Sequence, residues 1–198
     1  MQKRNATVAV IGAGDYIGGE IAKKFAAEGF TVFAGRRDGA KLEPLVKEIE
    51  AAGGSIVARS LDARKEDEIS AFLTAADQIA PLEVCIFNVG ANVHFPLIET
   101  TERVFRKVWE MACYSGFLAV RESARLMLPR GRGAIFVRTC ANWLRHVARP
   151  LQFSPVHKLR HDHPGDAAFR RGPWVECARR AAVAMRVLPE AFRLDSAL

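Results

Sequence analysis

The chain has 198 residues, of which 49% are hydrophobic, and it carries a formal net charge of +7. This length predicts one domain with a substantial core, and no apolar run approaches the length of a membrane span. Residues 1–137 carry 18 Lys and Arg against 17 Asp and Glu, whereas residues 138–198 carry 11 against 5. A face that binds polyelectrolytes is therefore an interpretation for the last third alone.

The N-terminus and the cysteines favour a reduced, cytoplasmic setting. The opening residues lead straight into an apolar stretch, which is not the pattern of a signal peptide. The cysteines are widely spaced and include no CxxC pair; they are Cys85, Cys113, Cys140 and Cys177. This spacing favours free thiols over a disulfide framework or a zinc site.

The first predicted elements are a strand, a glycine turn and a helix. Residues 8–11 are apolar and β-prone, which predicts a buried strand. Glycines follow at positions 12, 14, 18 and 19, and the amphipathic run 21–28 predicts a helix that Gly29 ends. Glycines let a backbone approach a ligand closely, and free N–H groups at a helix N-terminus attract anionic oxygens. We interpret the unit as a nucleotide site; a tight turn without a ligand is the alternative.

Strands and helices continue to alternate along the chain. Further strands are predicted at 31–34, 55–59, 82–87 and 133–137, and helices at 41–51, 66–79 and 101–128. This alternation predicts an α/β fold, a Rossmann-type doubly wound parallel sheet with helices on both faces.

Several predicted strands end in residues that suit a cofactor. Ligands of doubly wound sheets bind beyond the carboxyl ends of the strands. The candidate cofactor-binding residues at these ends are Gly12, Gly14, Asp15, Tyr16, Ile17, Gly18, Arg36, Arg37, Asp62, Asn88, Val89 and Gly90. Their convergence on one edge is a stronger indication than any single motif.

The pattern changes after Val137. Residues 138–198 hold five of the nine prolines and four of the five histidines, and only 175–188 predicts a helix. We therefore expect residues 1–137 to form a dinucleotide-binding Rossmann domain. Residues 138–198 form an Arg- and Pro-rich tail of the same domain, which leaves the sheet incomplete. No metal site is expected, because no carboxylate or cysteine has a matching spacing to His157, His161 and His163.

The first 137 residues resemble the short-chain dehydrogenase/reductase family. The glycine turn is similar to that family's Gly-x-x-x-Gly-x-Gly fingerprint, with Gly12 and Gly18 at its ends and Tyr16 in place of the middle glycine. Asp62 matches the acidic residue that holds the adenine, and residues 88–90 resemble the Asn-Ala-Gly motif after the fourth strand. The resemblance implies NAD(P)-dependent oxidoreductase activity on a small alcohol or carbonyl substrate, and a homodimer or tetramer.

Arg36 and Arg37 bear on the choice of cofactor. An acid after the second strand would bind the ribose 2′-hydroxyl of NAD. Two guanidinium groups stand there instead, and they suit a 2′-phosphate. A solvated turn is the alternative; we favour NADP(H) over NAD(H).

The catalytic residues that the resemblance implies are missing. The family uses a tyrosine as proton donor, a lysine four residues later, and a serine thirteen residues earlier. Phe153, His157 and Cys140 stand at these positions, and Cys113 stands where the family has an asparagine on the long helix. Because phenylalanine has no proton to give, we expect catalysis to be impaired, and the catalytic residues are unassigned. We interpret Tyr114 as a packing residue.

Residues 138–198 leave three explanations open. They form a diverged tail, a genuine binding extension, or the product of an altered reading frame or splice. The rival to an oxidoreductase is accordingly an NADP(H)-binding protein without turnover, or a remnant. A nucleic-acid binder is disfavoured, because the arginines lack interleaved aromatic residues and a recognised fold. We also expect the dimer to be weak or absent, although Val104, Val108 and Trp109 could belong to its apolar face.

Overall fold

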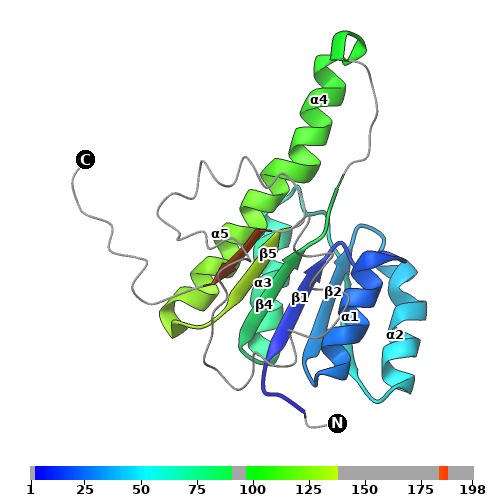
Figure 1. The fold of residues 1–198 in the computed structure, drawn as a ribbon, viewed down its shortest axis with the longest axis vertical. Helices are drawn as coiled ribbons and strands as arrows, with labels where there is room; N and C mark the ends of the chain where they lie inside the picture. Colours follow the sequence, from blue (N-terminus) through cyan, green and yellow to red (C-terminus); the bar gives the residue numbers. More distant parts are fainter. Residues whose placement is uncertain (1–2, 91–96, 138–182, 187–198) are drawn as a thin grey trace, which may run out of the picture.

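The fold is a six-stranded sheet between two layers of helices (Figure 1). A computed structural model describes residues 3–90, 97–137 and 183–186. The strand order is β3-β2-β1-β4-β5-β6. Five strands are parallel, namely β1 (Thr7–Ile11), β2 (Thr31–Arg36), β3 (Ser55–Ser60), β4 (Leu82–Phe87) and β5 (Ala134–Val137). The predicted α/β fold with a Rossmann-type sheet is confirmed.

The helices cover the two faces of the sheet. One face carries α1 (Ile17–Ala27), η1 (Gly39–Leu42) and α2 (Glu43–Ala51), and the other carries α3 (Glu66–Ile79) and α5 (Ser115–Met127). The remaining helical segments are η2 (Leu97–Glu99), α4 (Glu102–Trp109), η3 (Glu110–Tyr114) and η4 (Leu128–Arg130). Within the described residues, no helix combines the length and the apolar character needed to cross a membrane.

Strand β1 supplies both halves of the core. Its alternating side chains place Val8 and Val10 in one buried cluster and Ala9 and Ile11 in the other. All four are almost fully buried. Burial of a Val or Ile side chain stabilises the fold by about 1.5–3 kcal/mol, so β1 is held firmly and its carboxyl end is a rigid support for the turn that follows.

The second strand is longer than predicted. The stretch after Ala34 reads as a turn, yet β2 continues through Gly35 and Arg36 in parallel register with β3. The absence of a side chain at position 35 makes this possible, because a β-carbon there would come within 2.9 Å of Leu61 and Phe72. Tertiary packing therefore decides where the strand ends, and it fixes Arg36 in the sheet.

The long predicted helix at 101–128 contains a π-helical turn. Helices α4 and α5 are joined by η3, and Ser115 Oγ at the start of α5 donates a hydrogen bond of 2.6 Å to the Met111 carbonyl oxygen in η3. The wider turn stacks the rings of Trp109 and Tyr114, with centroids 5.8 Å apart. Figure 1 shows that α4 projects beyond the sheet, and none of its residues is buried.

The predicted helix at 175–188 is wrong at the residues that the structure describes. Strand β6 (Val183–Arg186) pairs antiparallel with β5. The free edge of β5 offers unpaired N–H and C=O groups, and pairing with them outweighs a weak helical propensity. The tail therefore contributes one strand to the sheet, which its sequence pattern does not predict. The rest of that tail lies outside the described residues.

Candidate functional site

The glycine turn packs tightly against the two strands beside β1. The N–H groups of Gly12 and Ala13 donate to the Gly35 carbonyl oxygen at 2.8 and 3.1 Å. Gly12 has a φ of +86°, a conformation that favours glycine. A β-carbon on Gly12 would lie 2.9 Å from the backbone of Asn88, and one on Gly18 would overlap the Gly12 carbonyl oxygen. At both positions the backbone therefore packs directly against backbone and leaves no room for a side chain.

The N-terminus of α1 leaves backbone donors at this turn. Tyr16 precedes the helix and supplies no side-chain cap. The N–H of Gly19 donates to the Gly14 carbonyl at 2.8 Å, and that of Glu20 to the Tyr16 carbonyl at 3.0 Å. The N–H groups of Ile17 and Gly18 come before these and have no acceptor within the helix. They suit an anion, which the positive end of the helix dipole would also stabilise.

Asn88 connects the end of β4 to the same turn. Its backbone N–H donates to the Ile11 carbonyl at 2.8 Å, and its side-chain Nδ2 donates to the Gly12 carbonyl at 3.0 Å. Its Oδ1 is buried and has no hydrogen-bond partner among the described residues. Val89 follows, with Cγ2 3.1 Å from a β-carbon placed on Gly12, whereas Gly90 faces open space. Residues 88–90 thus form the wall of the turn on the β4 side.

Arg36 connects the end of β2 to the turn through an ion pair. Its Nη1 donates to Asp15 Oδ1 at 2.8 Å and approaches the Lys41 carbonyl oxygen at 3.5 Å. The Arg36 side chain is 22% exposed and that of Asp15 is 73% exposed. Arg37 is exposed, and no hydrogen bond or ion pair of its side chain is found within the described part of the chain. The two predicted arginines therefore differ: Arg36 is held in an ion pair, and Arg37 is not, among the described residues.

Asp62 follows β3 and is held by its neighbour Arg64. Its oxygens accept hydrogen bonds from Arg64 Nε at 2.9 Å, Nη2 at 2.5 Å and the backbone N–H at 3.1 Å. These hydrogen bonds, of which those from the side chain have the largest effect, lower the pKa of Asp62 to about 2. The Leu61 N–H donates to the Arg36 carbonyl at 2.9 Å. Asp62 is the next residue along the chain, so it lies close to the end of β2.

The Asp62 ion pair predicts a pH dependence of stability. Because folding lowers the pKa from 3.8 to about 2, the stabilisation is present above pH 4 and is lost as pH falls through 2. A shift of this size corresponds to about 1–2 kcal/mol, after allowance for partial exposure. Urea unfolding should show that wild type loses about this much more stability than Asp62→Asn between pH 6 and pH 2. Parallel pH curves for the two proteins would contradict the assignment.

The structure brings most of the predicted site residues together at the carboxyl ends of the strands. Contacts join the glycine turn to Asn88 on one side and to Arg36 on the other, and Asp62 lies at the next strand end. Sequence reasoning missed Gly35, which accepts the hydrogen bonds of the turn. The available signal was a glycine near the end of an apolar strand, which often marks close backbone approach.

The predicted catalytic positions are only partly described. Cys113 and Tyr114 lie in η3, and the ring of Tyr114 is occupied by stacking on Trp109. Neither Cys85 nor Cys113 forms a disulfide among the described residues. Cys140, Phe153 and His157 lie outside the described residues, as do the three clustered histidines. Within the described residues, no group of three or more metal-binding side chains gathers.

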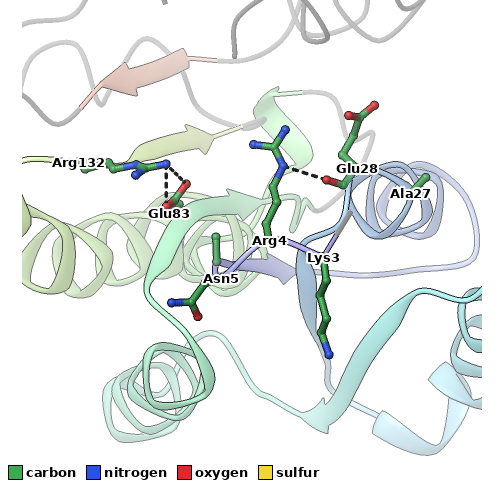
Figure 2. A pocket seen from close by; sticks show the side chains of 8 residues that line it. Lys3, Arg4, Asn5, Ala27, Glu28, Glu83 and Arg132 are labelled. Carbon is green, nitrogen blue, oxygen red and sulfur yellow. Dashed lines mark hydrogen bonds and ion pairs between the residues drawn. The ribbon is translucent and has the colours of Figure 1, made fainter. Parts of the chain in front are cut away.

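A separate cavity, whose lining side chains are drawn in Figure 2, lies at the other end of the strands. It has a volume of about 620 Å³ and is lined by Lys3, Arg4, Asn5, Ala6, Ala27, Glu28, Glu83 and Arg132. These residues lie at or near the amino ends of strands, away from the glycine turn. Its arginines are already engaged, since Arg4 Nε donates to the Glu28 carbonyl at 2.9 Å and Arg132 pairs with Glu83 at 2.9 Å. The cavity therefore contains none of the predicted cofactor residues.

Comparisons with known proteins find similarity to one family. A family model described as short chain dehydrogenase matches residues 6–143. Galactitol 2-dehydrogenase (L-tagatose-forming) of Cereibacter sphaeroides is 34% identical over 131 residues, which are 66% of this chain and 50% of that protein. The chain spans about half the length of the first curated relatives it matches.

Solved structures show the same similarity. A crystal structure of a short-chain dehydrogenase from Rhodopseudomonas palustris is similar with a TM-score of 0.66 and 80% identity, covering 67% of this chain and 62% of that one. A crystal structure of actinorhodin polyketide ketoreductase with NADPH is similar with a TM-score of 0.64 and 28% identity, covering 68% and 53%.

Proposed function

Because the chain belongs to the short-chain dehydrogenase/reductase family, we propose that it binds NADP(H) at the carboxyl edge of its sheet. The proposed ancestral activity is hydride transfer between the nicotinamide, which supplies this chemistry, and a small alcohol or carbonyl substrate. We further propose that this chain is impaired in that activity, because Phe153 stands where the family has its proton donor.

The shape of the glycine turn carries the proposal. β-Carbons on Gly12 or Gly18 would collide with the backbone of the turn or of Asn88. The helix behind the turn has N–H donors without acceptors in the helix. A pyrophosphate fits this combination, because its charged oxygens accept from backbone N–H groups and need close backbone approach. In this proposal the cofactor residues are the turn from Gly12 to Gly18, Arg36, Arg37, Asp62 and residues 88–90.

The preference for NADP(H) rests on the basic end of β2. The last residue of β2 and the residue directly after it are Arg36 and Arg37, where an acid would accept the ribose 2′-hydroxyl. The Arg37 guanidinium has no partner among the described residues. A guanidinium binds phosphate through charge-assisted hydrogen bonds. Of two similar solved structures of equal identity, one contains NADPH and the other contains NADH, so the basic end of β2 alone carries the choice.

Titration of the two cofactors tests this preference. NADPH should bind more tightly than NADH, and the double change Arg36→Ala with Arg37→Ala should weaken NADPH by about 1–3 kcal/mol, the value of lost charge-assisted hydrogen bonds. NADH binding should change little. Arg106→Ala is a matched control, because Arg106 is exposed on α4 and pairs only locally with Glu102. Equal affinities for both cofactors in wild type would refute the preference.

The setting and assembly of the protein are also proposals. A cytoplasmic location fits Cys85 and Cys113, which form no disulfide among the described residues. The family assembles into dimers or tetramers, and the exposed Phe105 and Trp109 of α4 are available for such a contact. We propose that the dimer of this chain is weak or absent, because the family interface also uses the segment that carries the tyrosine and lysine, and this chain has Phe153 and His157 at those positions.

A further inference from the structure

The ion pair between Asp15 and Arg36 places a negative charge inside the proposed cofactor site. Asp15 belongs to the glycine turn, and Arg36 is the last residue of β2. Their side chains join at 2.8 Å across two neighbouring strand ends. Arg36 is largely covered, whereas Asp15 is mostly exposed. In this ion pair the Arg36 guanidinium is therefore largely covered, whereas the Asp15 carboxylate faces solvent.

This arrangement conflicts with the binding of a further anion by Arg36. A 2′-phosphate that reached the guanidinium would have to share it with the Asp15 carboxylate or displace it. Sharing brings two like charges close together, which is unfavourable. Displacement loses the existing ion pair. Either way, Asp15 weakens the binding of NADP(H), which carries the 2′-phosphate, and leaves the binding of NAD(H) nearly unaffected.

We propose that Asp15 is a specificity-determining residue that limits the preference of this chain for NADP(H) over NAD(H). Its carboxylate occupies Arg36 and leaves Arg37 as the uncompensated cation at the end of β2. The inference rests on the proposed cofactor site and deepens it, because it assigns opposite effects to two charges of one ion pair.

Substitution of Asp15 tests the proposal directly. Asp15→Asn keeps the size of the side chain and removes its charge, and Asp15→Ser serves as a second variant. In fluorescence titrations, the Kd for NADPH should fall about fivefold or more, the factor that an exposed ion pair of about 1 kcal/mol represents. The Kd for NADH should stay within about twofold. Thermal unfolding of each variant establishes that it is folded.

Two further variants distinguish competition for Arg36 from a general effect of net charge. Asp38→Asn removes an exposed carboxylate that lies 3.5 Å from Lys41 at the same edge, and it should leave the NADPH-to-NADH ratio unchanged. In an Arg36→Ala background, the gain from Asp15→Asn should shrink, because the competition for Arg36 is gone.

The outcomes are distinguishable. If wild type binds both cofactors and Asp15→Asn leaves the ratio unchanged or weakens NADPH, the proposal for Asp15 is overturned and the cofactor site stands. An equal gain from Asp38→Asn would also overturn it, because the effect would then be one of net charge. If folded wild type binds neither cofactor, the cofactor site and this inference both fail.

Discussion

Replacement of Gly18 by alanine should abolish cofactor binding and destabilise the fold. The new β-carbon would overlap the Gly12 carbonyl oxygen and would lie 2.8 Å from Ala13 Cα and 3.0 Å from Asn88 Nδ2. The first two obstacles are backbone atoms, so the turn itself must move. Overpacking of this kind costs about 1–3 kcal/mol, and the better helical propensity of alanine offsets at most about 1 kcal/mol. NADPH affinity should fall about 100-fold or more, since the turn must lose its shape.

Gly14→Ala is the matched control for this variant. It makes the same chemical change four residues earlier, where a β-carbon would meet nothing within 4 Å. Its stability should stay close to that of wild type, so it separates the steric conflict at Gly18 from the chemical change itself. Titration calorimetry and thermal unfolding of both variants provide the comparison. Normal NADPH affinity in Gly18→Ala would show that the cofactor does not use this turn.

Local patterns were sufficient to predict the regular part of the fold. Helix α3 and strand β4 occupy the predicted ranges 66–79 and 82–87. In both, one pattern dominates: apolar residues at helical spacing in α3, and a run in β4 that is apolar except for Glu83. The glycine turn was predictable for a related reason, because its glycines stand between a strand and a helix.

Features that depend on distant partners could not be predicted. The ion pair of Asp15 and Arg36 joins residues that meet only because β1 and β2 are parallel neighbours, with Ile11 opposite Gly35. Likewise, β6 forms because β5 has a free edge, which the tail sequence does not reveal. The π-helical turn was hidden because the apolar spacing is helical on both sides of it. Each case needs a contact that no sequence window contains.

The 198-residue chain should bind NADPH and yet show no measurable reduction of simple aldehydes and ketones. Proton transfer by a positioned side chain contributes typically about 10²–10⁴-fold to a rate, and Phe153 cannot supply it. Tyr114 is a poor substitute, because its ring is stacked on Trp109 within the helix. The absorbance of the nicotinamide, followed with a panel of carbonyl substrates, measures turnover, and titration of the same sample establishes that the cofactor is bound.

A contaminating reductase is the main source of a false signal in this experiment, and Gly18→Ala purified in the same way controls for it. Carbonyl-dependent NADPH oxidation in wild type that disappears in Gly18→Ala would contradict the expected inactivity. The proton donor would then be sought among the remaining candidates with separate Tyr114→Phe, Cys140→Ser and His157→Gln variants. A donor lost by substitution should lower kcat by about 10²-fold or more while leaving the Kd for NADPH unchanged, because it acts on the reacting oxygen and not on the cofactor.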